Sequence, residues 1–509
     1  MLGWLKPQDK IEQSQQDSGL RQLMYDGALS QTMGVFTGGA FLVAFALLLG
    51  ASNLVIGLFA AIGPFTQILQ IPAVWLVDRT RLRKALVVFS SLASRSFWLI
   101  VAVIPWLLPA PLRVPVFVGC LVAFFGLGAI SGCAFNSWMR DLIPEQIMGR
   151  YFSRRMAVSM ALGAVLSMAA AFGVDYASAA WDAELGAYSV LFALGAVAGL
   201  AGVFFLMRVP EPKMVPPEEK RSLLASLVRP FRDTNFRRLL HFLAAWNFAA
   251  NLAGPFFVVF MLRRIGLPMT WIIGLSVLSQ LINVAFLRIW GKLADRYTNK
   301  SVLAVSGPLF MLSVLLWVFT TLPDRHVLTI PLLIGIHALS GMSTAGVGLC
   351  AGNIAMRLAP KGEATSYLAI NALVSGLAAT VAPILGGLAA DFFQTRELAI
   401  DMAWVSSARR FTLPVINLRG LDFLFIGAFL VGLYAIHRLV AVNEVGQVDE
   451  QVVYSELYAE VRKSVRHVSN VAGLRQMTYF PYVAVRKIAG TVTGLTNNVL
   501  GRNVPEDDD

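Results

Sequence analysis

Hydrogen-bonding side chains stand inside otherwise apolar stretches of this sequence, and four of them form two pairs. Asn247 and Asn251 are four residues apart, and Gln280 and Asn283 are three apart, so each pair would share one face of a helix. In hydrocarbon, such amides must either face a polar cavity or bond to a neighbouring helix. The pattern therefore fits two interpretations, a pocket for a polar solute or a set of interhelical hydrogen bonds.

Charged groups are scarce in the same stretches. Their apolar cores contain no Asp or Glu, although proton coupling across a membrane usually needs a buried group that changes charge. Arg95 lies inside one stretch, Asp26 stands at the entrance to the first, and His337 is of a residue type that can titrate near neutral pH. Arg95 and Asp26 are candidates for an anion or coupling site. The alternative is structural, with Arg95 held by neighbouring carbonyls or hydroxyls and His337 by packing.

Enzymatic motifs are missing from the sequence. It has no phosphate-binding loop, no His-Glu-x-x-His zinc motif and no nucleophilic serine elbow. Its five histidines are scattered, and its three cysteines all lie in apolar stretches. We therefore expect a chain that is not an enzyme and that needs no metal, disulfide or cofactor.

The elements that would position these residues are membrane helices. Hydrophobic residues make up 57% of the chain and charged residues 14%, and the mean hydropathy is +0.66. A spanning helix needs about 20 mostly apolar residues. The sequence predicts an all-α integral membrane protein with twelve transmembrane helices, at 27–49, 54–77, 85–107, 114–138, 156–174, 186–207, 239–262, 271–290, 302–321, 328–356, 367–390 and 421–440.

An internal duplication divides these helices into two sets of six. Three signatures recur in the same order with one constant offset, and homologous halves are a usual construction of membrane proteins that carry solutes. A Pro-rich, charged segment separates the halves and predicts a linker. The signatures are Ile-Gly-Leu at 56–58 and 273–275, Asp-Arg at 78–79 and 295–296, and Cys-Ala-x-Asn-x-x-Met-Arg at 133–140 and 350–357. The expected parts are an N-terminus (1–26), two six-helix bundles (27–207 and 239–440), the linker (208–238) and a C-terminal tail (441–509).

The net charge of +12 does not indicate nucleic-acid binding. Most Lys and Arg residues lie in the termini and in every second connection between the helices, which is the positive-inside pattern of a membrane protein. Residues 1–31 lack the apolar core of a signal peptide. We expect a multi-pass protein of a bacterial cytoplasmic (inner) membrane with both termini in the cytoplasm.

Together these features resemble the major facilitator superfamily over about residues 27–440. The segment Gly291-Lys292-Leu293-Ala294-Asp295-Arg296 is close to that superfamily's Gly-x-Leu-Ala-Asp-Arg loop motif, whereas the first copy, at 74–84, lacks the leading glycine. The resemblance implies a secondary transporter that moves a small solute by alternating access. It leaves the solute, the direction and any coupling ion open, and the amides favour a polar or anionic solute slightly over an amphipathic one.

Two sets of candidate sites follow, one from the chemistry of the Asp-Arg turns and one from the resemblance. The duplicated turns would act as latches while the two halves are closed against each other, and the alternative is that their arginines only anchor solvated loops. The gating candidates are Asp78, Arg79, Arg140, Asp295, Arg296 and Arg357. The helices that line the cavity in the superfamily supply the substrate candidates, which are Thr37, Gln67, Gln70, Asn247, Asn251, Gln280, Asn283, His337 and Asn371.

The tail lies outside this resemblance. Val453, Leu457, Val461, Val465 and Val468 form one stripe of an amphipathic helix, which would pack on the bundle's own loops, and residues 479–500 are a second candidate for the membrane surface. The same tail leaves another function open. The chain would then be a non-transporting sensor, assembly factor or lipid-handling scaffold whose tail recruits a protein partner.

Overall fold

The computed structural model describes residues 5, 7–214, 229–322, 324–360, 364–405, 410–444, 446, 452–453 and 455–460. Twelve helical segments within these residues are long and apolar enough to cross a membrane, in agreement with the predicted number. Several are interrupted. Residues of the first half form α1 (Gln13–Thr37), α2 (Gly39–Leu48), α3 (Asn53–Thr66), α4 (Gln70–Thr80), α5 (Arg83–Leu107), α6 (Ala110–Leu142), α7 (Glu145–Trp181) and α8 (Glu184–Leu206).

The second half repeats this order and adds a hairpin. Its elements are α10 (Thr234–Ala253), α11 (Phe256–Val259), a π-helical turn (Phe260–Ile265), α12 (Met269–Arg296), α13 (Asn299–Leu316), α14 (Thr329–Leu358), α15 (Ala364–Phe393), β1 (Glu397–Val405), β2 (Arg410–Arg419) and α16 (Leu421–Val440). Within each half the helices pack in matching pairs, α5 with α6 as α13 with α14, and α1 with α8 as α10 with α16. The halves meet mainly where α3 packs on α15 and α7 on α12.

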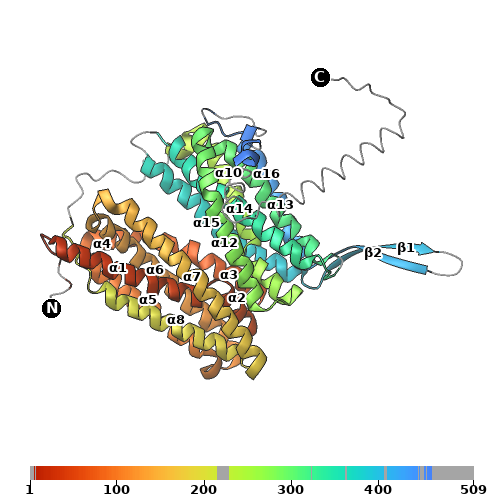
Figure 1. Cartoon of the computed structure of the whole chain (residues 1–509), viewed down its shortest axis with the longest axis horizontal. Helices are drawn as coiled ribbons and strands as arrows, with labels where there is room; N and C mark the ends of the chain where they lie inside the picture. Colours follow the sequence, from red (N-terminus) through yellow and green to blue (C-terminus); the bar gives the residue numbers. More distant parts are fainter. Residues whose placement is uncertain are drawn as a thin grey trace, which may run out of the picture.

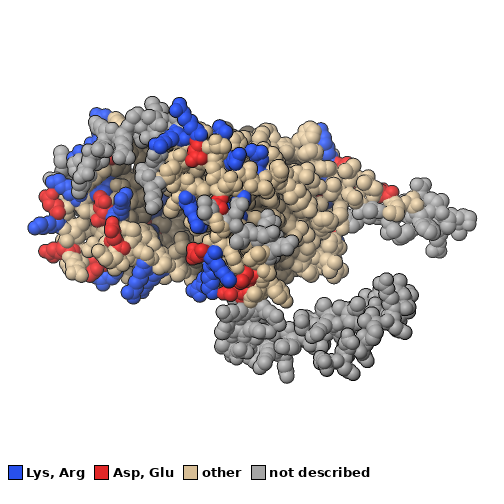
Figure 2. All heavy atoms as spheres, turned by 90° about the horizontal axis from the view of Figure 1, so that it is seen from above, with Lys and Arg blue, Asp and Glu red and all other residues tan. Residues whose placement is uncertain are grey.

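The two ends of the bundle differ. We call the end of the bundle where α4 and α12 finish, near Asp78 and Asp295, the turn end. The end from which β1 and β2 project is the hairpin end (Figure 1). In Figure 1 the two sets of helices converge toward α2 and α3 and diverge toward the turn end. In Figure 2 Lys and Arg side chains concentrate away from the hairpin, which is the distribution that the sequence predicted.

The antiparallel hairpin was not predicted. Its register pairs Glu397 with Arg419 and Ile400 with Ile416, with an irregularity after Ile400. Leu398, Ile400 and Met402 alternate with smaller or polar residues, the period-two pattern of a strand. The stretch is short and connects two long apolar helical runs, and the sequence therefore predicts only a connection between the spans at 367–390 and 421–440.

The first helix also starts earlier than predicted. α1 begins at Gln13, where Glu12 and Gln15 form a reciprocal capping box, rather than near Gly27. The polar first turns of α1 are stabilised by Leu20 and Leu23, which are buried against the rest of the N-terminal half. As a result Asp26 lies in the middle of α1 and not at its entrance.

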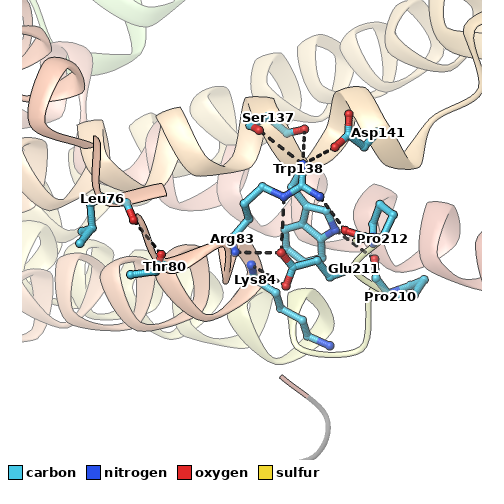
Figure 3. A network of polar contacts seen from close by, with 10 residues as sticks. All are labelled: Leu76, Thr80, Arg83, Lys84, Ser137, Trp138, Asp141, Pro210, Glu211 and Pro212. Atoms are coloured by element: carbon cyan, nitrogen blue, oxygen red, sulfur yellow. Dashed lines mark hydrogen bonds and ion pairs between the residues drawn. The ribbon is translucent and has the colours of Figure 1, made fainter. Parts of the chain in front are cut away.

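Two glutamates that follow the two halves cap equivalent helices at the turn end. After α8, Glu211 accepts hydrogen bonds from the backbone N–H groups of Arg83 (2.8 Å) and Lys84 (3.2 Å), which begin α5 (Figure 3). After α16, Glu444 accepts from the N–H of Lys300 (2.7 Å) at the start of α13. A carboxylate at a helix N-terminus satisfies free N–H groups and complements the helix dipole. In each half, the segment that follows the last helix therefore caps the third spanning helix, α5 in the first half and α13 in the second.

Arg83 completes the first of these caps. Its fully buried guanidinium pairs with Glu211 (3.4 Å) and Asp141 and donates to the Ser137 and Pro212 carbonyls (3.1 and 2.6 Å) (Figure 3). Burial raises the pKa of the Glu211 carboxyl above its usual value, and the N–H bonds and the charge of Arg83 oppose that shift.

Removing this carboxylate should destabilise the N-terminal half. Glu211→Ala removes the one ion-pair partner of the buried Arg83 that is itself buried, because the other partner, Asp141, is partly exposed. We expect the free energy of unfolding to fall by about 3–5 kcal/mol, seen as a lower thermal unfolding midpoint in detergent. Lys213→Ala, which removes only the exposed Lys213–Asp9 pair, is the control and should leave the midpoint unchanged. Equal midpoints for the two variants would contradict this account of the cap.

Candidate functional site

A cavity of about 560 Å³ lies between the two halves. It is lined by residues of α1, α2, α3 and α7 from the first half, and by the α10–α11 junction and α12 from the second. Most of the lining is apolar or glycine, including Val35, Phe41, Phe59, Met160 and Val258, and no lining residue carries a charge. The cavity is thus a neutral site shared by both halves.

The first spanning helix of each half is broken where it borders this cavity. Between α1 and α2, Gly38 is extended and Gly39 has a φ of +55°, a conformation that glycine adopts without strain. Between α10 and α11 stand Gly254 and Pro255, and the proline has no N–H to bond the carbonyl of Asn251. All four break residues line the cavity. Interrupted helices at matching places in two repeats are a recognised mark of a solute site.

Two side-chain amides face the cavity without a protein partner. Gln31 comes from α1 and Gln280 from α12, and neither amide makes a hydrogen bond to another described residue. The hydroxyl groups of the lining serines already donate hydrogen bonds within their own helices, Ser167 to the Ala164 carbonyl (3.1 Å) and Ser276 to the Ile272 carbonyl (2.9 Å). Each half therefore presents one amide that is free to bind a solute.

Of the nine predicted substrate residues, only Gln280 lines this cavity. Asn247 and Asn251 donate to carbonyls one turn earlier in α10, at 2.8 and 2.7 Å, and Asn283 donates to Thr344 at 3.1 Å. The others bond to neighbours in their own membrane-spanning segments: Thr37 to Met33, His337 to Leu333, Ser375 to Asn371, and Gln70 to Gln67. Gln31 was missed because the late predicted start of the first helix placed it near the membrane surface.

Asp26 and Arg95 were predicted as candidates for an anion or coupling site, and the structure pairs them with each other. Arg95 pairs with Asp26 (3.3 Å) and donates to Ser30 (2.9 Å) and to the Gly199 carbonyl, while Arg155 approaches Asp26 at 3.9 Å. A methyl group at Gly202 would lie within 3 Å of the ends of both side chains, so the glycine gives the pair room to form there. The cluster lies within the N-terminal half and outside the lining of the central cavity.

Two carboxylates join the halves at the hairpin end. Asp391, near the end of α15, accepts from the N–H groups of Asn53 and Leu54, both at 2.9 Å, at the start of α3. Asp175, near the end of α7, accepts from the N–H groups of Met269 and Thr270, both at 2.8 Å, at the start of α12. Each contact caps a helix of the other half. Their similar places in the two repeats were the signal that sequence reasoning overlooked.

The Asp-Arg turns make no such contact in this conformation. Asp78 and Asp295 are exposed, and neither forms an ion pair or hydrogen bond with a described residue. Arg79 lies over the ring of Trp75 (5.1 Å), Arg357 pairs with Glu444 (3.3 Å) and Arg140 is exposed. Among the described residues, contacts between the halves are therefore strong at the hairpin end and missing at these turns.

Comparison with known proteins agrees with this architecture. The sequence profile of the Major Facilitator Superfamily matches residues 27–383 and 289–408. This chain belongs to the Major Facilitator Superfamily. No curated protein is similar enough in sequence to count as a match.

Solved structures of superfamily transporters share the fold. A point mutant of the nucleoside transporter NupG has a TM-score of 0.63 and 14% identity, and the match covers 84% of this chain and 100% of that one. A bacterial homologue of the iron transporter ferroportin in an inward-facing state has a TM-score of 0.56 and 14% identity, covering 86% of this chain and 100% of that one. At these identities the likeness establishes the fold alone.

The described part of the C-terminal tail packs beside the second Asp-Arg turn. Val453 and Leu457 are buried on the C-terminal half, Glu456 pairs with Arg296 (3.1 Å) and Glu460 with Lys292 (2.7 Å). The first part of the predicted stripe is therefore packed on the bundle. Val461, Val465, Val468 and residues 479–500 lie outside the described residues.

The repeated Ile-Gly-Leu signature provides a matched test of the hairpin-end contact. A methyl group at Gly57 would overlap the carbonyl oxygen of Pro383 in α15, whereas one at Gly274 would meet only the terminal carbon of Met168 at 3.7 Å. Gly57→Ala should therefore push α3 from α15 and cost about 1–3 kcal/mol, which lowers the ratio of the closed to the open hairpin end by roughly 5- to 150-fold. Gly274→Ala should be nearly neutral.

The measurement is the rate at which a polar maleimide labels a cysteine introduced at Val43, a cavity residue, after the three native cysteines are replaced. We expect faster labelling for Gly57→Ala alone. Equal rates in the two alanine variants would show that the α3–α15 approach does not close this end.

Proposed function

We propose that this chain is a secondary transporter that carries a small organic solute across the bacterial inner membrane by alternating access. The observation that carries the proposal is the central cavity between two repeated halves, which are joined at the hairpin end and separated at the Asp-Arg turns. With the turn end in the cytoplasm, as the distribution of Lys and Arg favours, this conformation is inward-facing. Its partners are the solute and the lipid bilayer.

The alternation would exchange one set of contacts for another. Opening the hairpin end removes the Asp175 and Asp391 caps from the helices of the opposite halves, which exposes four N–H groups. Closing the turn end brings the Asp78 and Asp295 turns against the opposite halves, where their carboxylates gain partners. Because each state has carboxylate contacts that the other lacks, neither is favoured by a large margin, as alternating access requires.

The two groups of aspartates should therefore act in opposite directions. Asp175→Asn and Asp391→Asn weaken the hairpin end and should shift the population toward the outward-facing state. Asp78→Asn and Asp295→Asn weaken the turn end and should shift it toward the inward-facing state. A shift of about 1.4 kcal/mol changes the ratio of the two states tenfold.

Distances between paired spin labels, one pair across the halves at each end, would measure these populations in liposomes. Asp401→Asn, which changes an exposed carboxylate on β1, is the control and should leave the distances unchanged. Shifts in the same direction for both groups, or none in either, would argue for the non-transporting scaffold.

The similar solved structures do not indicate which solute this chain carries. Their names refer to transport of nucleosides and metals, and to a homologue of the lysosomal transporter Spinster. Such different cargoes on one fold mean that the solute must be argued from the cavity of this chain.

A further inference from the structure

We infer that the transported solute is an uncharged, ring-containing molecule that bridges the two halves by hydrogen bonds to Gln31 and Gln280. The inference rests on the proposed transport function and adds the chemical class of the solute. It replaces the slight preference for a polar or anionic solute that the amide pairs suggested, since three of those four amides lie outside the cavity lining.

The absence of charge from the lining is the first argument. Transferring an ion from water to an apolar site costs several kcal/mol unless an opposite charge receives it. None of the cavity residues can do so, because the lining, all of it within the described part of the chain, holds no Asp, Glu, Lys, Arg or His. The nearby Asp26, Arg95 and Arg155 charges are directed at one another inside the N-terminal half. When the halves close around a solute, this cavity would therefore admit a neutral molecule and reject its charged relative.

The hydrogen-bonding groups of the lining are the second argument. Each glutamine amide offers both a donor and an acceptor, and the two come from opposite halves. The breaks at Gly38–Gly39 and Gly254–Pro255, which both line the cavity, interrupt the backbone hydrogen bonds of the two facing helices. A solute that both donates and accepts hydrogen bonds at two points can satisfy the two halves together.

Shape and wall chemistry are the third argument. About 560 Å³ is the size of a pocket for a drug-sized molecule, and such pockets are mostly apolar with a few oriented polar groups. Here Phe41, Phe59, Met160, Val258 and Ile273 supply the apolar walls. Aromatic and thioether side chains pack well on a flat ring. The fitting class is an uncharged molecule that carries a ring and a few amide- or hydroxyl-like groups.

Matched probes that differ in charge test this inference on the purified full-length protein. Uridine and uridine 5′-monophosphate form one pair, and chloramphenicol and its hemisuccinate form another. A ligand that binds the folded state raises the unfolding midpoint as its concentration exceeds its dissociation constant. We expect the uncharged member of at least one pair to raise the midpoint at millimolar concentration, and its charged counterpart to bind at least tenfold more weakly.

Glutamine variants locate the binding. Gln31→Leu and Gln280→Leu keep the volume of the side chain and remove its hydrogen bonds, and each should raise the dissociation constant of the bound probe at least tenfold. Gln70→Leu is the matched control, because Gln70 is exposed and lies outside the cavity. It should bind the probe like the unmodified protein.

Three results would overturn the inference. They are equal or tighter binding of the charged probes, unchanged binding in both Gln31→Leu and Gln280→Leu, and no shift by either uncharged probe. None of them bears on alternating access, which the spin-label distances test separately. The experiments can therefore show that the proposed class of solute is wrong without contradicting the proposal of transport.

Discussion

The free N–H groups at helix starts are the constraint on which this structure depends. Inside a membrane a helix satisfies its own backbone except at its ends, where the first N–H groups need partners from elsewhere. At four helices these partners are carboxylates that lie far away in the sequence. Glu211 and Glu444 cap α5 and α13 from segments that follow their own halves, whereas Asp391 and Asp175 cap α3 and α12 from the opposite half.

This division separates what stays rigid from what can move. Caps made within a half persist whatever the halves do, and the Glu211 cap is reinforced by the fully buried Arg83. Caps made across the halves depend on their relative position, since a carboxylate loses both of its N–H donors when α3 or α12 moves away. The same interaction thus stabilises each bundle and, at the hairpin end, one arrangement of the two bundles.

The location of the remaining charges follows a similar logic. Asp26 and Arg95 satisfy one another within the N-terminal half, and glycines at 199 and 202 allow the arginine to approach the neighbouring helix. The central cavity keeps only neutral donors and acceptors, at Gln31, Gln280 and the two helix breaks. The charged pair therefore stabilises the N-terminal half, whereas the groups that line the cavity are uncharged.

The sequence by itself determined the twelve spans, the two repeats and the superfamily, because long apolar runs and recurring signatures are properties of the chain that need no partner. Only the tertiary structure decided which polar residues face the cavity. Asn247 and Asn251 share a helix face, but their side chains reach the carbonyls one turn earlier, and Gln31 faces the cavity because α1 begins well before the apolar run.

The carboxylate caps join residues between 94 and 338 positions apart, and no local pattern encodes such a pairing. It exists only once helix packing has brought the end of one helix to the start of another.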